Sequence, residues 1–237
     1  MINPRLSEAE SARIREAYLR RERNVPGDRY SVFKEENLIA RQQLERKTIS
    51  LLRRHGCAQL EQKRILEVGC GSGFWLRQFV QWGAKPQNLV GIDLLFDSIA
   101  RGRELCPDGM SLQCGDANAL DFEDESFDVV MQFTAFSSVL NQETQANLAA
   151  EICRVTKPDG LILWFDFFIS NPKNPDVSGV TRRRISQLFP GYPLDLDRVV
   201  LAPPIARFVA LFSPSLCRLL SMLTPLCTHY LGIIKKP

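Results

Sequence analysis

A carboxylate and three glycines, each two residues from the next, form the part of the sequence best suited to hold a ligand. The pattern is Glu67-x-Gly69-x-Gly71-x-Gly73. Glycines let a ligand approach the backbone closely, and the amides at the start of a following helix can donate hydrogen bonds to it. A carboxylate here would attract an amino group or another cation and would repel a pyrophosphate. The spacing also differs from the G-x-G-x-x-G of dinucleotide-binding loops, because the third glycine comes one residue earlier.

Two further acids follow apolar segments downstream of this loop. Asp93 ends the segment 88–93, 20 residues after Gly73, and Asp116 ends the segment 111–116. Ligands of open α/β sheets bind where parallel strands end, so we expect both acids and the loop to share one site. The position of Asp93 also suits a carboxylate that accepts hydrogen bonds from ribose hydroxyls.

Alternating apolar segments must position these residues. Strands are predicted over 64–68, 88–93, 111–116, 127–133 and 161–165. Between them, apolar residues recur at helical spacing after Gly73 and again over 141–156, where Pro158 and Gly160 end the helix. This alternation predicts a mainly parallel sheet with helices on both faces. Helices are also predicted over 1–25 and 34–54, before the first strand.

Over residues 64–168 these motifs resemble the class I S-adenosylmethionine (SAM) dependent methyltransferases. The resemblance implies an α/β fold with a doubly wound, mainly parallel seven-stranded sheet (Rossmann-like), N-terminal helices and a helical insertion near the C-terminus. Its last two strands are expected at about 195–201 and 228–234. Three parts are then expected: a helical extension over 1–60 that covers the cofactor cleft, a SAM-binding core over 61–170, and a substrate-side part over 171–237.

The resemblance implies SAM as cofactor, S-adenosylhomocysteine (SAH) as its product, and no metal. An acid at Asp116 would accept a hydrogen bond from the adenine amino group, and the Ala117 amide would read the ring. Tyr30 and Arg41, near or in the leading helix, would reach the methionine end, with surface packing as the alternative for both. The implied cofactor residues are Glu67, Gly69, Cys70, Gly71, Gly73, Asp93, Leu94, Asp116, Ala117, Gln132, Tyr30 and Arg41.

Two residues are candidates for the reaction itself. Asp166 interrupts an apolar segment at the end of the fifth predicted strand. A buried aspartate needs partners, so this one is either hydrogen-bonded structurally or functional. His229 lies near the start of the last predicted strand. A neutral imidazole can act as a general base, and packing beneath the insertion is the alternative.

Methyl transfer is an in-line displacement that requires alignment of the acceptor and does not demand a general base. Family members that methylate exocyclic or amide nitrogens often show an acid or Asn followed by two prolines after the fourth strand, where this sequence has Gln132-Phe133-Thr134-Ala135. We therefore expect a small-molecule or glycan acceptor methylated on oxygen. A helix is predicted over 178–189 and contains Arg182–Arg184. These arginines and the apolar insertion Pro203–Leu226 favour an acceptor with an anionic end and an apolar body. The alternatives are an RNA or protein methyltransferase that uses the basic flanks, and a SAM-binding protein without catalysis.

Charge is unevenly distributed along the chain. Residues 65–169 carry 6 basic and 15 acidic side chains, whereas the segments on either side each have a net charge of +6. An acidic centre between basic flanks suits a central cationic cofactor and an anionic partner, although an uneven solvated surface would look the same. Nucleic acid is not expected, because few aromatic residues are interleaved with the basic residues of 1–25.

Seven scattered cysteines without a C-x-x-C pair or zinc spacing predict reduced thiols and a cytoplasmic protein. No apolar segment approaches the ~20 residues needed to span a bilayer. The insertion Pro203–Leu226 is expected to be a substrate lid, with a peripheral membrane element or core cover as alternatives.

Overall fold

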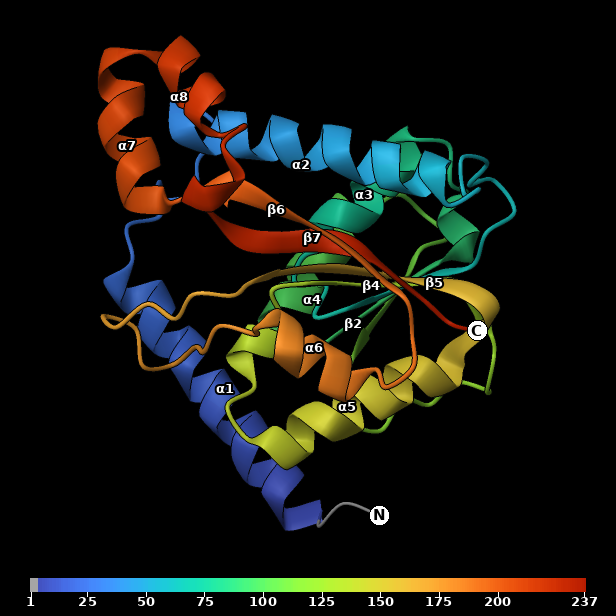
Figure 1. The fold of residues 1–237 in the computed structure, drawn as a ribbon. Helices are drawn as coiled ribbons and strands as arrows, with labels where there is room; N and C mark the ends of the chain where they lie inside the picture. Colours follow the sequence, from blue (N-terminus) through green and yellow to red (C-terminus); the bar gives the residue numbers. More distant parts are fainter. Residues whose placement is uncertain (1–3) are drawn as a thin grey trace.

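The computed structural model describes the backbone of residues 4–237 and the side chains of residues 8–237. Its centre is a seven-stranded sheet in the order β3-β2-β1-β4-β5-β7-β6 (Figure 1). Strands β1 to β5 pair in parallel, and β7 runs antiparallel to both β5 and β6. The strands are β1 (Ile65–Val68), β2 (Leu89–Asp93), β3 (Ser111–Cys114), β4 (Phe127–Phe133), β5 (Thr156–Phe167), β6 (Leu194–Leu201) and β7 (Cys227–Lys235). The seven-stranded methyltransferase-like fold predicted from the sequence is confirmed.

Helices cover both faces of this sheet. Helices α1, α5 and α6 lie on one face, α2, α3 and α4 on the other, and α7 and α8 stand beside the start of α2 (Figure 1). The helices are α1 (Pro4–Asn24), α2 (Glu35–Arg54), α3 (Phe74–Gln81), α4 (Phe96–Leu105), α5 (Gln142–Val155), α6 (Arg182–Leu188), α7 (Pro203–Phe212) and α8 (Pro214–Leu220), with short 3-10 turns η1 (Pro86–Asn88), η2 (Phe136–Ser138) and η3 (Thr224–Leu226). Residues 1–3 of the helix predicted over 1–25 lie outside the described residues.

Alternating side chains of the central strands build two separate cores. On β4, Val130 packs into the cluster that contains Ile152 of α5. Its neighbours Val129 and Met131 point to the opposite face, into the cluster that contains Phe79 of α3. Because both faces of a parallel strand are covered by helices, these strands read as nearly continuous apolar runs.

Helix α6 is shorter than the helix predicted over 178–189. The backbone of 178–180 is used by neighbouring segments instead: Ser178 N donates to Ser137 O, and Val180 N donates to Phe167 O, both at 2.8 Å. The helix then begins after Thr181, whose side chain accepts a hydrogen bond from the Arg184 amide. Long-range pairing of this kind cannot be read from local periodicity.

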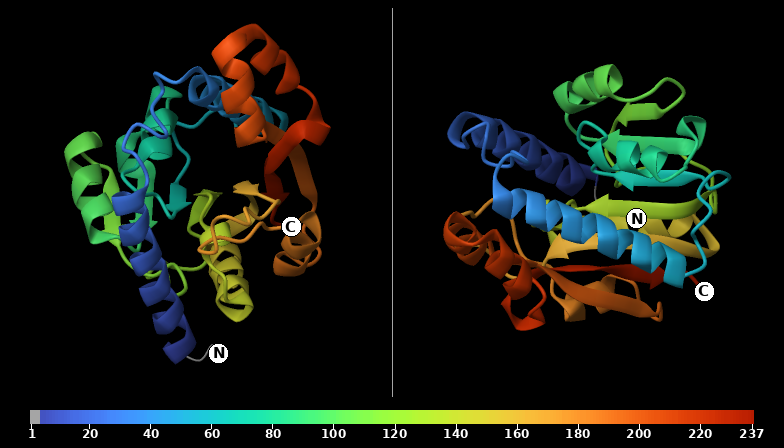
Figure 2. Two further views of the ribbon diagram at one scale, coloured as in Figure 1. Left: turned by 90° about the vertical axis from the view of Figure 1, so that its left-hand side faces the viewer. Right: turned by 90° about the horizontal axis from the view of Figure 1, so that it is seen from above.

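The carboxyl ends of β1 to β5 form the edge at which the predicted site residues gather. Helix α1 crosses this edge, which faces the viewer in the left panel of Figure 2. Strand β6 also ends here, because Leu201 pairs with Cys227 at the start of β7, just beyond the pairing of Phe167 with His229. Helices α7 and α8 follow β6 directly, so they stand at the same edge.

Candidate cofactor-binding site

The glycine loop connects β1 to α3 in a conformation that only glycine adopts easily. Gly69, Gly71 and Gly73 all have positive φ, between 52° and 73°. A Cβ on Gly73 would also lie 2.7 Å from the Cys106 sulfur, whereas nothing lies within 4 Å of one on Gly71. Gly71 is therefore required for its backbone conformation, and Gly73 for its conformation and for space.

Asp93 connects this loop to the end of β2. Its Oδ2 accepts a hydrogen bond from the Gly71 amide at 2.8 Å, and its Oδ1 accepts one from the Leu95 amide at 2.9 Å. Burial raises the pKa of this carboxyl, and the two amide bonds oppose the shift. A carboxylate has about four lone-pair positions, so each oxygen can still accept from a ligand hydroxyl.

Asp116 follows β3 and is held by residues from two different parts of the chain. Its Oδ1 accepts from the backbone and side-chain nitrogens of Asn118 at 2.9 and 2.8 Å. Its Oδ2 accepts from the hydroxyl of Ser11, on α1, at 2.7 Å. Helix α1 therefore reaches the acid that would bind the adenine amino group.

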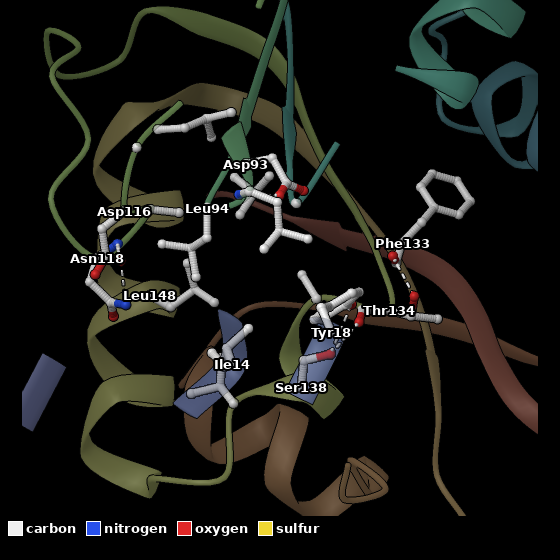
Figure 3. Close-up of a pocket in the computed structure, with 18 residues that line it drawn as sticks. Ile14, Tyr18, Asp93, Leu94, Asp116, Asn118, Phe133, Thr134, Ser138 and Leu148 are labelled. Atoms are coloured by element: carbon white, nitrogen blue, oxygen red, sulfur yellow. Dashed lines mark hydrogen bonds between the residues drawn. The ribbon is translucent and has the colours of Figure 1, made fainter. Parts of the chain in front are cut away.

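A cavity of about 90 Å³ lies between these acids and α1 (Figure 3). Of the residues predicted to bind the cofactor, five line it: Gly69, Asp93, Leu94, Asp116 and Ala117. Sequence reasoning missed several other lining residues, among them Ile14, Tyr18, Asn118, Thr134 and Ser138.

Thr134 carries a structural signal that the sequence does not show. It has φ of 62°, which is unusual for a β-branched residue and tends to mark functional sites. The conformation is held because the Thr134 amide donates to Phe165 O at 2.8 Å and its hydroxyl donates to Phe133 O at 2.7 Å. Thr134 thus turns the chain sharply from β4 into the cavity wall.

Three of the predicted cofactor residues are buried beneath the loops and do not line the cavity. Glu67 is 2% exposed, its Oε2 has no hydrogen-bond partner among the described residues, and burial raises its pKa well above the usual value. Gln132 is fully buried, and its Oε1 accepts from the Ala135 amide at 2.9 Å. Cys70 is also buried, which raises its pKa. In this structure Gln132 supports the β4 loop, while Glu67 retains an unpaired oxygen below the glycine loop.

Tyr30 and Arg41, predicted at the methionine end of the cofactor, lie outside the cavity wall. Tyr30 is 61% exposed, and its ring stacks under the Arg21 guanidinium at 5.0 Å. The Arg41 guanidinium lies 4.4 Å from the centre of the Phe74 ring, at the start of α3. The side chains that enter the cavity from the N-terminal helices are instead those of α1, Ile14 and Tyr18.

Asp166, one of the two candidate catalytic residues, is fully buried away from the cavity. Its Oδ2 accepts from the Ser137 amide at 3.0 Å and its Oδ1 from the Phe167 amide at 2.9 Å. Burial raises its pKa to about 7, while the hydrogen bonds from Ser137 and Phe167 lower it. In this position Asp166 fastens the loop after β4 to the end of β5.

His229, the second candidate, ends a row of rings that begins at the end of β4. The ring of Phe133 points away from the cavity (Figure 3) and stacks on Trp75, and the next ring, Phe165, lies 5.6 Å from Phe133. His229 stacks on Phe165 at 5.1 Å, and its Nδ1 lies 3.0 Å from the Thr228 hydroxyl. Burial lowers the pKa of His229 to about 4, so the ring is neutral at pH 7.

The chemistry of this site fits SAM. Acids at the ends of β2 and β3, and the unpaired oxygen of Glu67, suit a ligand with hydroxyls, amino groups and positive charge. The cavity of about 90 Å³ is partly open to the surface. Because Ser11 of α1 donates to Asp116, an outward movement of α1 would enlarge the site.

Helix α1 is fastened to this position by polar contacts along its length. Glu10 accepts from the amides of Leu140 and Asn141, and Arg20 forms an ion pair with Asp176 at 2.7 Å. The hydroxyl of Tyr18 also lies 3.3 Å from that of Ser138. Several of these contacts would break together if α1 opened.

Many basic side chains in the two flanks are paired with acids. Lys47 and Asp197 lie 3.1 Å apart, Lys34 and Asp28 2.9 Å, and Arg54 and Asp195 3.5 Å. Arg184 of the predicted arginine trio binds Gln145 Oε1 at 2.9 Å. This pairing reduces the positive charge that the flanks offer to a polyanion.

Comparisons with known proteins agree with this geometry. Residues 65–160 match the model of a family described as a methyltransferase domain. Phthiotriol/phenolphthiotriol dimycocerosates methyltransferase 1 of Mycobacterium ulcerans is 34% identical over 134 residues, which cover 54% of this chain and 48% of that protein. A fatty-acid O-methyltransferase of Mycolicibacterium smegmatis is 36% identical over 115 residues, covering 46% of this chain and 39% of that protein. The chain thus spans less than half the length of either relative.

Among solved structures, a SAM-dependent methyltransferase from Methanosarcina mazei has the same fold. The TM-score is 0.56 at 17% identity, and the match covers 76% of this chain and 94% of that one. At this identity the likeness concerns the fold alone.

Proposed function

We propose that the chain is a class I SAM-dependent methyltransferase and that it methylates a carboxylate oxygen at the end of a long apolar acceptor. When bound, SAM supplies an electrophilic methyl group on a cationic sulfur. One observation carries the proposal for the acceptor: no described residue of the cavity wall is a free general base. The titratable lining residues are Tyr18, Asp93 and Asp116, and both acids already accept hydrogen bonds.

In this proposal the cofactor is held by the ends of the first three strands. Asp93 accepts from the ribose hydroxyls, and Asp116 and the Ala117 amide bind the adenine ring. Glu67, with its unpaired buried oxygen, and the glycine loop receive the amino-acid end. The role of Asp166 is to hold the loop after β4 in place, because its carboxyl is fully buried away from the cavity.

The absence of a free base in the described cavity wall favours an acceptor that is already ionised. A carboxylic acid with a pKa near that of Glu, about 4.3, is deprotonated at pH 7 and has no proton to lose. An alcohol must lose a proton, and the candidate base His229 has a pKa of about 4, which makes it a weak base. A carboxylate oxygen takes the methyl group and loses its charge as the sulfur loses its own, so the reaction balances without proton transfer.

An apolar body is supported by the side chains next to the cavity. The rings of Trp75, Phe133 and Phe165 form a row from the end of β4 toward His229, on the face of the sheet opposite the cavity's apolar side chains. One of the relatives reported above is a fatty-acid O-methyltransferase. A saturated fatty acid therefore combines the anionic end and the apolar body that the residues favour.

The test is an acceptor panel with the full chain and SAM. A long-chain fatty acid, the alcohol of the same chain length and a neutral glycan are compared by mass spectrometry of the products. We expect the fatty-acid methyl ester, with the alcohol and the glycan unchanged. Methylation of the alcohol but not of the acid would overturn the proposal.

The two alternative functions are separated by an assay with SAM that carries a labelled methyl group. Transfer of this label to total RNA or to a protein would favour a macromolecular acceptor, although the ion pairing of the basic flanks argues against it. SAM binding without product on any acceptor would favour a non-catalytic SAM-binding protein.

A further inference from the structure

Helices α7 and α8, with the turn that follows, expose many large apolar side chains. Within this segment, called here the α7–α8 hairpin (residues 203–223), Leu211 is 81% exposed, Phe212 75%, Met222 74% and Phe208 67%. The remaining exposed large apolar residues of the hairpin are Ile205, Leu216, Leu219 and Leu223. Contiguous apolar surface of this kind marks an interaction site.

The hairpin is fixed to the protein through its small residues. Ala206, Ala210 and Cys217 are buried against Ile39 of α2 and Leu201 of β6. In addition, Gln43 of α2 donates to Ser221 O at 2.8 Å and accepts from the Val200 amide at 3.1 Å. The bulky side chains therefore point outward because the small ones face the core, so the exposed surface is a feature of a packed element.

The segment that contains the hairpin carries charge of one sign. Residues 198–237 contain five basic side chains and no acidic one, and Arg207 and Arg218 belong to the hairpin itself. Within the described part of the chain, neither of these arginines forms a salt bridge. Acids near the hairpin, Glu35 and Glu36, lie at the first turn of α2, where they act on the buried Cys217.

The hairpin stands at the same edge of the sheet as the cofactor cavity. It follows β6 at the edge where β1 to β5 end, and Figures 1 and 2 show it beside this edge with α1. Phe33, which is 97% exposed, comes just before α2, whose Ile39 packs against the hairpin. A surface that received the hairpin would thus lie next to the side from which an acceptor reaches the methyl group.

We propose that the α7–α8 hairpin is a docking surface for the face of an anionic lipid bilayer, with its bulky apolar side chains entering the boundary between headgroups and acyl chains. Short amphipathic helices with an apolar side and flanking arginines bind such interfaces without crossing them. No helix among the described residues is long and apolar enough to cross a membrane. A second copy of the chain is a poorer occupant, because it would bring Arg207 and Arg218 of both copies together, whereas an anionic surface would pair with them.

Vesicle sedimentation with the full chain tests this proposal. Phosphatidylcholine vesicles with and without phosphatidylglycerol are used, and we expect stronger binding to the vesicles that contain phosphatidylglycerol, weakened by salt. Leu211→Glu and Phe212→Glu should each reduce the association constant for these vesicles by about tenfold or more. Both side chains are mostly exposed, so these variants are expected to fold.

Leu105→Glu is the matched control, since Leu105 is 49% exposed at the far end of α4 and should not affect vesicle binding. Arg207→Gln with Arg218→Gln should remove the preference for phosphatidylglycerol. Binding of SAH, measured by calorimetry, should be unchanged in every variant, which separates this surface from the cofactor site and from the acceptor proposed above.

Three outcomes would overturn the proposal: no binding to either vesicle, equal binding of Phe212→Glu and wild type, or equal losses in Leu105→Glu and Phe212→Glu. If light scattering shows that the wild-type protein is a dimer, that Phe212→Glu is a monomer, and that neither binds vesicles, the surface would be assigned to a second copy instead.

Discussion

Residues 65–133 and residues 198–226 differ in which side chains they bury. In the first region, the acids next to the glycine loop are partly or fully buried and held in place, as Glu67 and Asp93 are. In the second region, large apolar side chains such as Leu211 and Phe212 are turned toward the surface. The first arrangement needs a defined backbone and defined partners, whereas the second needs only a stable base and an outward face.

This difference explains why the first region can be recognised and the second cannot. The match to the methyltransferase family covers residues 65–160 and ends before β6 and the α7–α8 hairpin. Cofactor binding is the task that relatives with different acceptors share, so its residues follow a common pattern. In our proposal, the segments outside that match select the acceptor and contact the surface on which it is presented.

The largest expected effect concerns Asp166, which in our account holds two loops together and does not contact substrate. Its pKa of about 7 in the folded protein exceeds the unfolded value of about 3.9. Between these two pH values, Asp166 is therefore protonated in the folded state and ionised in the unfolded state. The free energy of unfolding should therefore fall as pH rises through this window, by about 4 kcal/mol, and level off above about pH 7. Asp166→Asn should remove this component.

Urea unfolding of wild type and Asp166→Asn from about pH 5 to about pH 8 measures the effect. The stability of the variant relative to wild type should increase with pH across this range. Parallel curves would mean that Asp166 is ionised in the folded state and open to a functional role.

The next effect tests the cofactor region directly. Asp93→Ala removes the acceptor of the Gly71 and Leu95 amides as well as the proposed ribose contacts. We expect a loss of about 2–3 kcal/mol in SAH binding by calorimetry. Asp97→Ala, an exposed acid in the first turn of α4, is the control and should bind normally. A change below about threefold for Asp93→Ala, under ~0.7 kcal/mol, would show that Asp93 only shapes the turn.

A smaller effect is expected where α1 closes the cavity. Glu10→Ala releases the Leu140 and Asn141 amides and should loosen α1 by about 1 kcal/mol, because these bonds are partly exposed. The dissociation rate of SAH, followed by stopped flow, should then rise about fivefold, with Glu8→Ala as an exposed control on the same helix. An unchanged rate would mean that α1 does not limit cofactor release.

The smallest effect is expected at His229. A general base contributes about 10²–10⁴ to a rate, so its loss would be plain. For a carboxylate acceptor we expect His229→Phe, which preserves the stacking on Phe165, to turn over within about threefold of wild type. A fall of about a hundredfold or more would make His229 the base and would favour a hydroxyl acceptor.

The strands and most helices could be predicted from the sequence because their apolar periodicity is local. Strand β4 has the predicted bounds, Phe127–Phe133, and the predicted strand at 195–201 begins one residue earlier, at Leu194. Helix α6 was predicted too long because the 178–180 backbone pairs with residues of distant segments. The glycine loop and the acids after β2 and β3 were placed at one edge by the same local reasoning.

The cavity wall was less predictable because α1 enters it through long-range contacts. Ser11 and Asp116 are 105 residues apart, and nothing in the local pattern of α1 marks Ser11, Ile14 or Tyr18 as site residues. Tyr30 and Arg41 were chosen by their place in the N-terminal extension, yet they pack against Arg21 and Phe74. The unusual φ of Thr134 has no signal in the sequence at all.

The most direct test of this division uses one double variant, Leu211→Glu with Phe212→Glu. Two quantities are measured for it: the affinity for SAH, and the KM for a fatty acid presented in vesicles that contain phosphatidylglycerol. The account predicts an SAH affinity within about twofold of wild type and a KM raised about tenfold or more, since distant sites act additively. A weakened SAH affinity, or an unchanged KM, would contradict it.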